Sequence, residues 1–291
     1  MSDATTPIGE RILAVDIGGT KIEAALVDRE GTIAFRQRIE TKSSDANLIG
    51  ALGELLHEVR SHGSVSGVGV GCGGPMRENG RFVSPLNIPV WRDFALLQSL
   101  RDLTGLPVFI DNDAKALALG EGRFGAAQGV HNYLSMVVST GVGGGIVLDG
   151  RLLDGREGNA GHVGHVVVIP DGRACACGAR GCLEAETSGA AIEQMTGSAA
   201  SEASLEIKQR TGYLVGRAVS SVAALLDLER CFVAGSVALG FGEPFFRSAN
   251  DSVREHAWIS HAAQLLIEPS ALTTDGPLLG AACVAWRSFG C

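Results

Sequence analysis

The chain has few aromatic residues and no long apolar run. Aromatic side chains make up 5% of its 291 residues, and tyrosine occurs only twice. No stretch approaches the roughly 20 consecutive apolar residues that a membrane-spanning helix needs. The first ten residues are polar and lack the basic segment and apolar core of a secretory signal. We therefore expect neither a membrane span nor a secretory leader.

Basic charge is also scarce. The chain has 24 Lys and Arg against 32 Asp and Glu, a formal net charge of -8. An acidic surface repels phosphate backbones and anionic lipids, so neither a nucleic-acid nor a membrane partner is expected. The seven cysteines are an odd number. Without a visible leader, that number indicates a reducing compartment, and we expect a cytoplasmic protein.

Glycine, in contrast, is abundant, with 40 residues, and 45% of the chain is hydrophobic. This composition is typical of a globular protein with a sizeable core, and the length suffices for one large domain or two ordinary ones. The glycines concentrate in short segments, which indicates tight turns and close approaches of backbone to a ligand.

Hydrophobic periodicity predicts alternating strands and helices. Residues 11–40 are predicted as an antiparallel meander of three strands with a tight first turn. Residues 133–148 repeat the order of strand, glycine turn and strand, which indicates an internal duplication unless two glycine-rich hairpins are alike by chance. Residues 196–204 are the best candidate for a mobile loop. Further strands are predicted at 65–70, 108–110 and 231–234, and helices at 47–59, 94–103, 111–120, 212–226 and 276–285.

Two glycine turns are candidates for binding a nucleotide. In the first, Asp16 ends a buried strand and is followed by Gly18, Gly19, Thr20 and Lys21. Backbone N–H groups of such a turn can approach phosphate oxygens, and the carboxylate can hold magnesium directly or through water. A hairpin turn without a ligand explains this segment about equally well.

The second glycine turn spans residues 139–145 and includes Thr140, Gly141, Gly143 and Gly144. Two turns of this kind in one chain can grip one nucleotide from both sides. Gly235 and Ser236, which follow an apolar strand, are a weaker candidate for a third backbone surface beside the adenosine.

Two polar clusters carry further chemistry. Asp111, Asn112 and Asp113 follow a short strand and open a helix, where one carboxylate can accept the proton of an attacking hydroxyl. Helix capping explains one of these three residues but not all of them. The other cluster combines one imidazole and three thiols, the donor set of a closed tetrahedral zinc site. Its members are His165, Cys175, Cys177 and Cys182. A reduced loop without metal is the alternative.

Taken together, these motifs resemble the ROK family of repressors, open reading frames and sugar kinases. The resemblance covers nearly the whole chain. It rests on DIGGTK at Asp16, GCGGP at Gly71, PLNIPVW at Pro85, DNDA at Asp111, STGVGGG at Ser139, AGHVGH at Ala160, CACGARGCLE at Cys175 and GPLLGAA at Gly276.

The resemblance implies an α/β, actin-like (ribonuclease H-like) fold of two lobes with an interlobe cleft. It places residues 1–113 and 280–291 in a smaller N-terminal lobe and residues 114–279 in a larger lobe that carries the zinc loop. ATP, Mg2+ and a structural Zn2+ are the implied cofactors, and a homodimer is the implied assembly. The segment 188–211 looks short for the family, which puts the dimer in question.

The resemblance also assigns roles to residues. Asp113 matches the general base that deprotonates the 6-hydroxyl of a sugar, and Asn112 matches a ligand of another sugar hydroxyl. Asp16 matches the carboxylate near magnesium. His165 matches a residue that binds zinc with one ring nitrogen and sugar with the other. Further implied sugar-side residues are Glu184, Gly74 and Asn87.

Two departures from the family pattern concern single residues. His162 stands where many members have a glutamate that binds the anomeric end of a hexose. Bacterial N-acetylmannosamine kinases resemble this chain here, with AGH rather than AGE. Because histidine can donate or accept, it tolerates a different substituent there. Lys115 replaces a common asparagine, and we expect a minor effect.

We therefore predict an ATP-dependent kinase of glucose, N-acetylmannosamine or a related hexose. The alternatives are a non-catalytic sugar sensor and a polyphosphate-dependent glucokinase. A DNA-binding repressor is disfavoured because the first nucleotide motif begins at Asp16 and the charge is acidic.

Overall fold

The computed structural model describes residues 11–42 and 46–290 and divides into two compact units. Unit 1 comprises residues 1–124, 154–159 and 274–291, and unit 2 comprises residues 125–153 and 160–273. Cys291 and the first ten residues, in which no leader was expected, lie outside the described residues. Among the described residues, no helix is long and apolar enough to cross a membrane.

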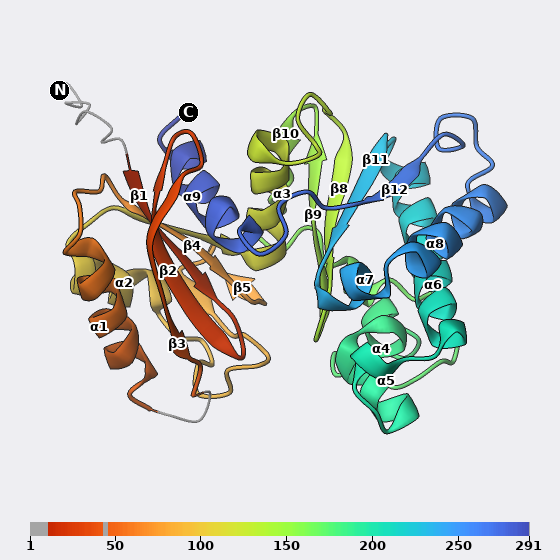
Figure 1. Cartoon of the computed structure of the whole chain (residues 1–291), viewed down its shortest axis with the longest axis horizontal. Helices are drawn as coiled ribbons and strands as arrows, with labels where there is room; N and C mark the ends of the chain where they lie inside the picture. Colours follow the sequence, from red (N-terminus) through yellow and green to blue (C-terminus); the bar gives the residue numbers. More distant parts are fainter. Residues whose placement is uncertain (1–10, 43–45, 291) are drawn as a thin grey trace. The chain divides into compact units, whose positions relative to one another are not determined.

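Unit 1 is built on a five-stranded sheet of order β3-β2-β1-β4-β7 (Figure 1). The first three strands pair antiparallel, as the meander prediction requires, and β4 and β7 add in parallel to β1. The strands are β1 (Arg11–Ile17), β2 (Lys21–Asp28), β3 (Ile33–Glu40), β4 (Val68–Cys72) and β7 (Val108–Asn112).

Helices cover both faces of this sheet. One face carries α1 (Leu48–Arg60) and α2 (Leu96–Thr104), and the other carries α3 (Asp113–Phe124) and α9 (Gly276–Ser288) (Figure 1). Helix α1 buries Leu48, Leu52, Leu55, Leu56 and Val59, the stripe that its periodicity predicts. A small hairpin of β5 (Met76–Arg77) and β6 (Phe82–Val83) follows β4.

Unit 2 repeats the architecture with the sheet order β10-β9-β8-β11-β12. Three antiparallel strands are again followed by two parallel ones, so the two sheets share order and direction. This agreement supports the internal duplication. The strands are β8 (Tyr133–Val138), β9 (Val142–Leu148), β10 (Arg151–Leu152), β11 (Arg230–Ala234) and β12 (Leu266–Pro269).

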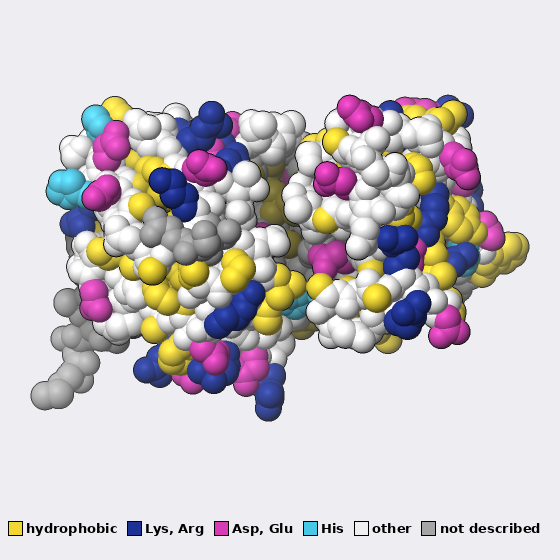
Figure 2. All heavy atoms as spheres, turned by 90° about the horizontal axis from the view of Figure 1, so that it is seen from below, with side chains coloured by type: hydrophobic (Ala, Val, Ile, Leu, Met, Phe, Trp, Pro, Cys, Tyr) yellow, Lys and Arg dark blue, Asp and Glu magenta, His cyan; other side chains and the backbone are white. Residues whose placement is uncertain are grey.

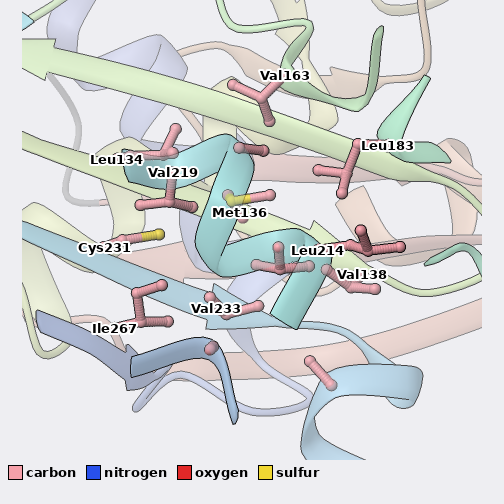
Figure 3. Close-up of a cluster of buried hydrophobic side chains, with 14 of the residues drawn as sticks. Leu134, Met136, Val138, Val163, Leu183, Leu214, Val219, Cys231, Val233 and Ile267 are labelled. Carbon is pink, nitrogen blue, oxygen red and sulfur yellow. The ribbon is translucent and has the colours of Figure 1, made fainter. Parts of the chain in front are cut away.

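The core of unit 2 forms between this sheet and its long helix (Figure 3). Leu134, Met136 and Val138 of β8 lie with Leu214 and Val219 of α6 in one buried cluster. The helices of unit 2 are α4 (Leu183–Thr187), α5 (Gly189–Thr196), α6 (Leu205–Leu226), α7 (Ser236–Phe241) and α8 (Glu243–His256), with short 3-10 helices η1 (Val163–His165) and η2 (Ala200–Glu202).

Three expectations about elements need correction. Helix α6 begins at Leu205 rather than at Gly212, because Ser204 caps it by accepting a hydrogen bond from Ile207 N. Strand β9 begins at Val142 rather than at Gly145, so three glycines of the second turn lie in a strand. The stretch 196–204, expected as a loop, contains η2.

Charge is mixed over one face of the molecule. On the face drawn in Figure 2, basic and acidic side chains lie interspersed. The chain as a whole is acidic, as its composition states.

Candidate active site

The carboxylates of unit 1 meet at the carboxyl ends of its parallel strands. Asp16 of β1 pairs in register with Gly71 of β4, and Gly71 pairs with Asp111 of β7. A Cβ at Gly71 would lie 3.8 Å from Asp16 Oδ1 and 3.5 Å from the Cα of Asp113. Asp16 and Asp113 therefore lie on either side of Gly71, which has no side chain to separate them.

The environments of these two carboxylates differ. Burial raises the pKa of Asp16 to about 7, and the charges of Asp113 and Glu23 contribute to the rise. Such a group is stabilised by a proton or a cation. Asp113 is exposed at the start of α3 and is thus accessible to a ligand.

Asn112 caps helix α3. Its Oδ1 accepts hydrogen bonds from Ala114 N at 3.1 Å and Lys115 N at 3.4 Å. One oxygen of Asp113 accepts a hydrogen bond from Ala114 N at 2.9 Å. Because Asn112 takes the capping position, capping does not by itself explain why carboxylates stand on either side of it.

The first glycine turn packs tightly against a predicted sugar-side residue. Gly18 N donates to Lys21 O at 3.0 Å and closes the turn between β1 and β2. A Cβ on Gly19 would lie 2.4 Å from the Cβ of Asn87. The structure therefore brings together the first glycine turn and Asn87. Gly74 lies on the same unit, between β4 and the β5–β6 hairpin.

Lys21 of this turn is committed to an ion pair. Its Nζ lies 2.6 Å from an oxygen of Glu23, whose buried side chain also receives the guanidinium of Arg36. Bonding to Lys21 and Arg36 keeps the pKa of Glu23 low, although burial acts in the opposite direction. Glu23 and Arg36 were not predicted from the sequence. The signal for Glu23 is an acidic residue in a strand whose inner residues are otherwise apolar.

The second turn and the third candidate surface lie together in unit 2. Ser139 N donates to Gly141 O at 2.9 Å, and the hydroxyls of Ser139 and Ser236 are 3.0 Å apart. Gly235 has a φ of +100°, and a Cβ there would lie 2.3 Å from Val138 O. Parallel pairing of β8 with β11 thus places 139–141 beside 235–236.

Two of the glycines predicted as phosphate contacts serve packing. Gly143 pairs with Val137 inside the sheet, and a Cβ on Gly144 would lie 2.9 Å from Val163. Gly161 in turn could carry no side chain, because a Cβ there would lie 2.3 Å from Gly144 O. The glycines of β9 therefore let the segment that carries His162 and His165 approach the strand.

Glu184 connects two of the predicted groups. Its Oε2 accepts a hydrogen bond from Val142 N at 2.9 Å, at the end of the second turn. A Cβ on Gly141 would lie 2.9 Å from the same oxygen. A residue predicted as a sugar ligand thus borders the turn predicted to grip phosphate.

The predicted metal ligands form one cluster. The ligand atoms of His165, Cys175, Cys177 and Cys182 all lie within 4.8 Å of one another. The sulfurs of Cys177 and Cys182 are 3.7 Å apart, and Cys175 Sγ is 3.7 Å from His165 Nδ1. A tetrahedral zinc with Zn–S bonds of about 2.3 Å separates its sulfurs by about 3.8 Å. The donor set and spacing fit this ion.

The thiols of the cluster differ in acidity. Burial raises the pKa of Cys182 to about 12 and also raises that of Cys175. A hydrogen bond from the backbone of Ala179 lowers the pKa of Cys177. A metal that takes all three sulfurs as thiolates must therefore displace protons.

The predicted sugar-side residues are divided between the units. Gly74, Asn87, Asn112 and Asp113 belong to unit 1, and His162, His165 and Glu184 belong to unit 2. Within unit 2, the rings of His162 and His165 stack with centroids 6.0 Å apart.

The chain belongs to the ROK family, whose profile it matches over residues 12–288. It is 31% identical to a glucokinase of Thermotoga maritima, with 96% of this chain and 98% of the relative covered. It is 35% identical to an N-acetylmannosamine kinase of Citrobacter koseri, with 94% and 98% covered.

A solved structure is also similar to this chain over nearly its whole length. The ROK family glucokinase of Streptomyces griseus, in complex with glucose and AMPPNP, superposes with a TM-score of 0.83 at 30% identity, covering 95% of this chain and 99% of that one. The expected actin-like, two-lobed α/β fold is thereby confirmed.

Proposed function

We propose that this protein is an ATP-dependent sugar kinase that transfers the γ-phosphate to the 6-hydroxyl of a hexose or N-acylhexosamine. The observation that carries the proposal is the exposed carboxylate of Asp113 beside the half-buried carboxylate of Asp16. The named activities of the glucokinase and N-acetylmannosamine kinase relatives support it.

Asp113 acts as the general base in this proposal. It takes the proton of the sugar hydroxyl as that oxygen attacks the γ-phosphorus in line with the leaving ADP oxygen. Asn112 orients a second hydroxyl. In unit 2, His162, His165 and Glu184 keep the roles of sugar ligands that the resemblance implies.

Asp16 and the glycine turns serve the nucleotide. The magnesium that accompanies ATP neutralises charge on its phosphates. Asp16 would hold this ion directly or through water, since neighbouring negative charge and burial make its carboxylate a good partner for a cation. Gly18–Gly19 and Thr140–Gly141 offer backbone N–H groups to phosphate oxygens, with Gly235 and Ser236 beside the adenosine.

The zinc ion has a structural role in this proposal, and the cytoplasm is the proposed compartment. The six described cysteines are unbridged, which suits reducing conditions.

The test is ADP release with glucose, mannose, N-acetylglucosamine and N-acetylmannosamine at one ATP concentration. Asp113→Asn should lower turnover by at least about 1000-fold, because transfer loses its base, while sugar binding measured by calorimetry persists. Asp102→Asn, at an exposed carboxylate of α2, is the matched control and should turn over normally. Full activity of Asp113→Asn would refute the assignment.

The same panel separates the alternatives. A sugar sensor would bind a sugar and release no ADP with any of the four. A polyphosphate-dependent enzyme would form sugar phosphate faster from polyphosphate than from ATP.

A further inference from the structure

Lys115 is a fully buried lysine with three acceptors. Its side chain is 1% exposed. An ammonium in the interior requires opposite charge and satisfied donors. Nζ lies 2.8 Å from Asp111 Oδ1, 3.1 Å from Asp154 Oδ1 and 3.1 Å from Gly158 O. Each of the three ammonium hydrogens thus has a partner.

A second cation balances the two carboxylates. Arg287 of α9 lies 3.0 Å from Asp154 Oδ1 and 3.8 Å from Asp111 Oδ2. The four side chains, which we term the Lys115 cluster, are Lys115, Asp111, Asp154 and Arg287. They come from α3, β7, the segment 154–159 and α9, and their formal charges cancel.

The segment 154–159 extends the cluster to the β5–β6 hairpin. It belongs to unit 1, although unit 2 contributes the residues before and after it. Asn159 Oδ1 accepts from Met76 N at 2.9 Å, and Asn159 Nδ2 donates to Met76 O at 2.7 Å. Glu157 accepts from Glu78 N at 2.9 Å. The hairpin directly follows Gly74, a predicted sugar-side residue.

At its other end, the cluster reaches the turn that carries the proposed base. Asp111 Oδ1 also accepts a hydrogen bond from Asn112 N at 2.8 Å, and Lys115 N approaches Asn112 Oδ1. The ammonium therefore contacts a carboxylate that shapes this turn and, through Gly158 and Asp154, the segment that holds the hairpin.

We propose that Lys115 is a positioning residue: its ammonium ties the segment 154–159, and through it the hairpin 76–83, to the turn of Asn112 and Asp113. The inference rests on the proposed sugar kinase activity for its catalytic consequence. It replaces the minor effect that the sequence led us to expect for Lys115.

The experiment compares two variants. Lys115→Met removes the charge at similar length and leaves a net negative cluster. Lys115→Met with Asp111→Asn restores the charge balance, because Arg287 and Asp154 stay paired, but it does not restore the tie. The control is Val219→Ala, a cavity in the core of unit 2 that lowers stability at a distance.

If Lys115 positions the site, kcat falls about 10- to 100-fold in both variants, because a small misplacement of a base is costly. The double variant should regain most of the melting temperature without regaining kcat. Val219→Ala should keep its kcat. A double variant with wild-type kcat would show that Lys115 serves stability alone and would overturn the proposal.

Hydrogen exchange provides a readout that needs no activity. Both variants should exchange faster in 76–83 and 154–159 than the wild type, with unchanged protection in β8 and α6. Unchanged protection in 76–83 and 154–159 would show that Lys115 does not hold these segments in place, and it would overturn the proposal. If the wild type releases no ADP with any sugar, the kinase proposal fails by itself, and hydrogen exchange still decides the role of Lys115.

Discussion

Asp16 is a residue whose chemistry depends on its burial. In an unfolded chain its carboxyl ionises near the ordinary value of 3.8, whereas in the folded chain its pKa is raised to about 7. Between these pH values the folded state holds a proton that the unfolded state has released. The free energy of unfolding therefore falls as pH rises through this window and levels off above about 7.

The direction of this pH dependence predicts how the stability of Asp16→Asn compares with that of the wild type when no magnesium is added. At pH 8 the variant should be more stable than the wild type by about 1–3 kcal/mol, because it has no carboxylate to leave ionised in the interior. At pH 4 the difference should vanish. Thermal unfolding of both proteins between pH 4 and 8 measures this difference in stability. If the melting temperatures of the two proteins changed in parallel with pH, the prediction would be contradicted. The same variant should lose phosphoryl transfer.

His162 carries the prediction about substrate. It precedes η1 directly, and its ring stacks on that of His165, a predicted ligand of both zinc and sugar. His162→Glu restores the acceptor that many family members have. We expect the ranking of kcat/KM on the sugar panel to shift toward glucose by about tenfold, as for one gained hydrogen bond to a charged group. His57→Glu, on α1 of unit 1, should leave the ranking unchanged, and an unchanged ranking for His162→Glu would refute the idea.

At the residue scale, the acidic and glycine positions could be singled out from the sequence because each has a local signature. Lys115 had none. A lysine in the first turn of a helix is ordinarily solvated, and only the arrival of Asp154 and Gly158 from a distant segment makes it a buried charge.

The loop between His162 and Glu184 is the element whose stability depends most on the proposed metal. Strands hardly contribute to it, and two isolated bridges join Ala174 to Arg180 and Val167 to Cys182. The buried carboxylate of Glu186 anchors the loop: it accepts hydrogen bonds from Arg173 N at 2.8 Å and from the guanidinium of Arg210 at 2.6 Å. Backbone hydrogen bonds, among them Cys175 N to Ala179 O at 2.8 Å and Gly181 N to Arg173 O at 2.8 Å, and the cysteine cluster hold the rest of the loop.

Removal of zinc should loosen this loop before unit 2 unfolds. We expect chelation to raise the KM for sugar with little initial change in melting temperature, since His165 lies in the loop. Because burial raises the pKa of Cys175 and Cys182, zinc binding should release protons and weaken as pH falls. Metal analysis and proton release measure this effect.

Cys177→Ser should reproduce the effect of chelation, and Cys231→Ser, at a buried thiol of β11, is the control that should keep its zinc. The prediction would be contradicted if the wild-type protein were purified without zinc, or if its KM for sugar stayed the same after chelation.

Elements were predicted correctly where hydrophobic periodicity was strong, as in α1, and less accurately where glycine interrupted the pattern. From the sequence, the glycines of β9 indicate a loop. The structure shows a second reason for it, the close approach of 161–164, which the strand alone does not reveal.

At the scale of the whole molecule, the two units share one strand order in their sheets. Each unit has its own apolar core, one built around β1, β4 and α1 and the other around β8, β11 and α6. Such cores allow each unit to fold as a compact body. The homodimer implied by the resemblance stays a prediction.

The sequence by itself determined the strands of the first meander, the glycine turns, the Asp111–Asp113 cluster and the Cys3His residue cluster. These features depend on spacing along the chain, so they can be recognised without a fold. The tertiary structure alone decided the Lys115 cluster, the Glu23–Arg36 pair and the hydrogen bond from Val142 to Glu184. The strength of each of these contacts depends on burial and on partners from distant segments, and neither is visible in a linear sequence.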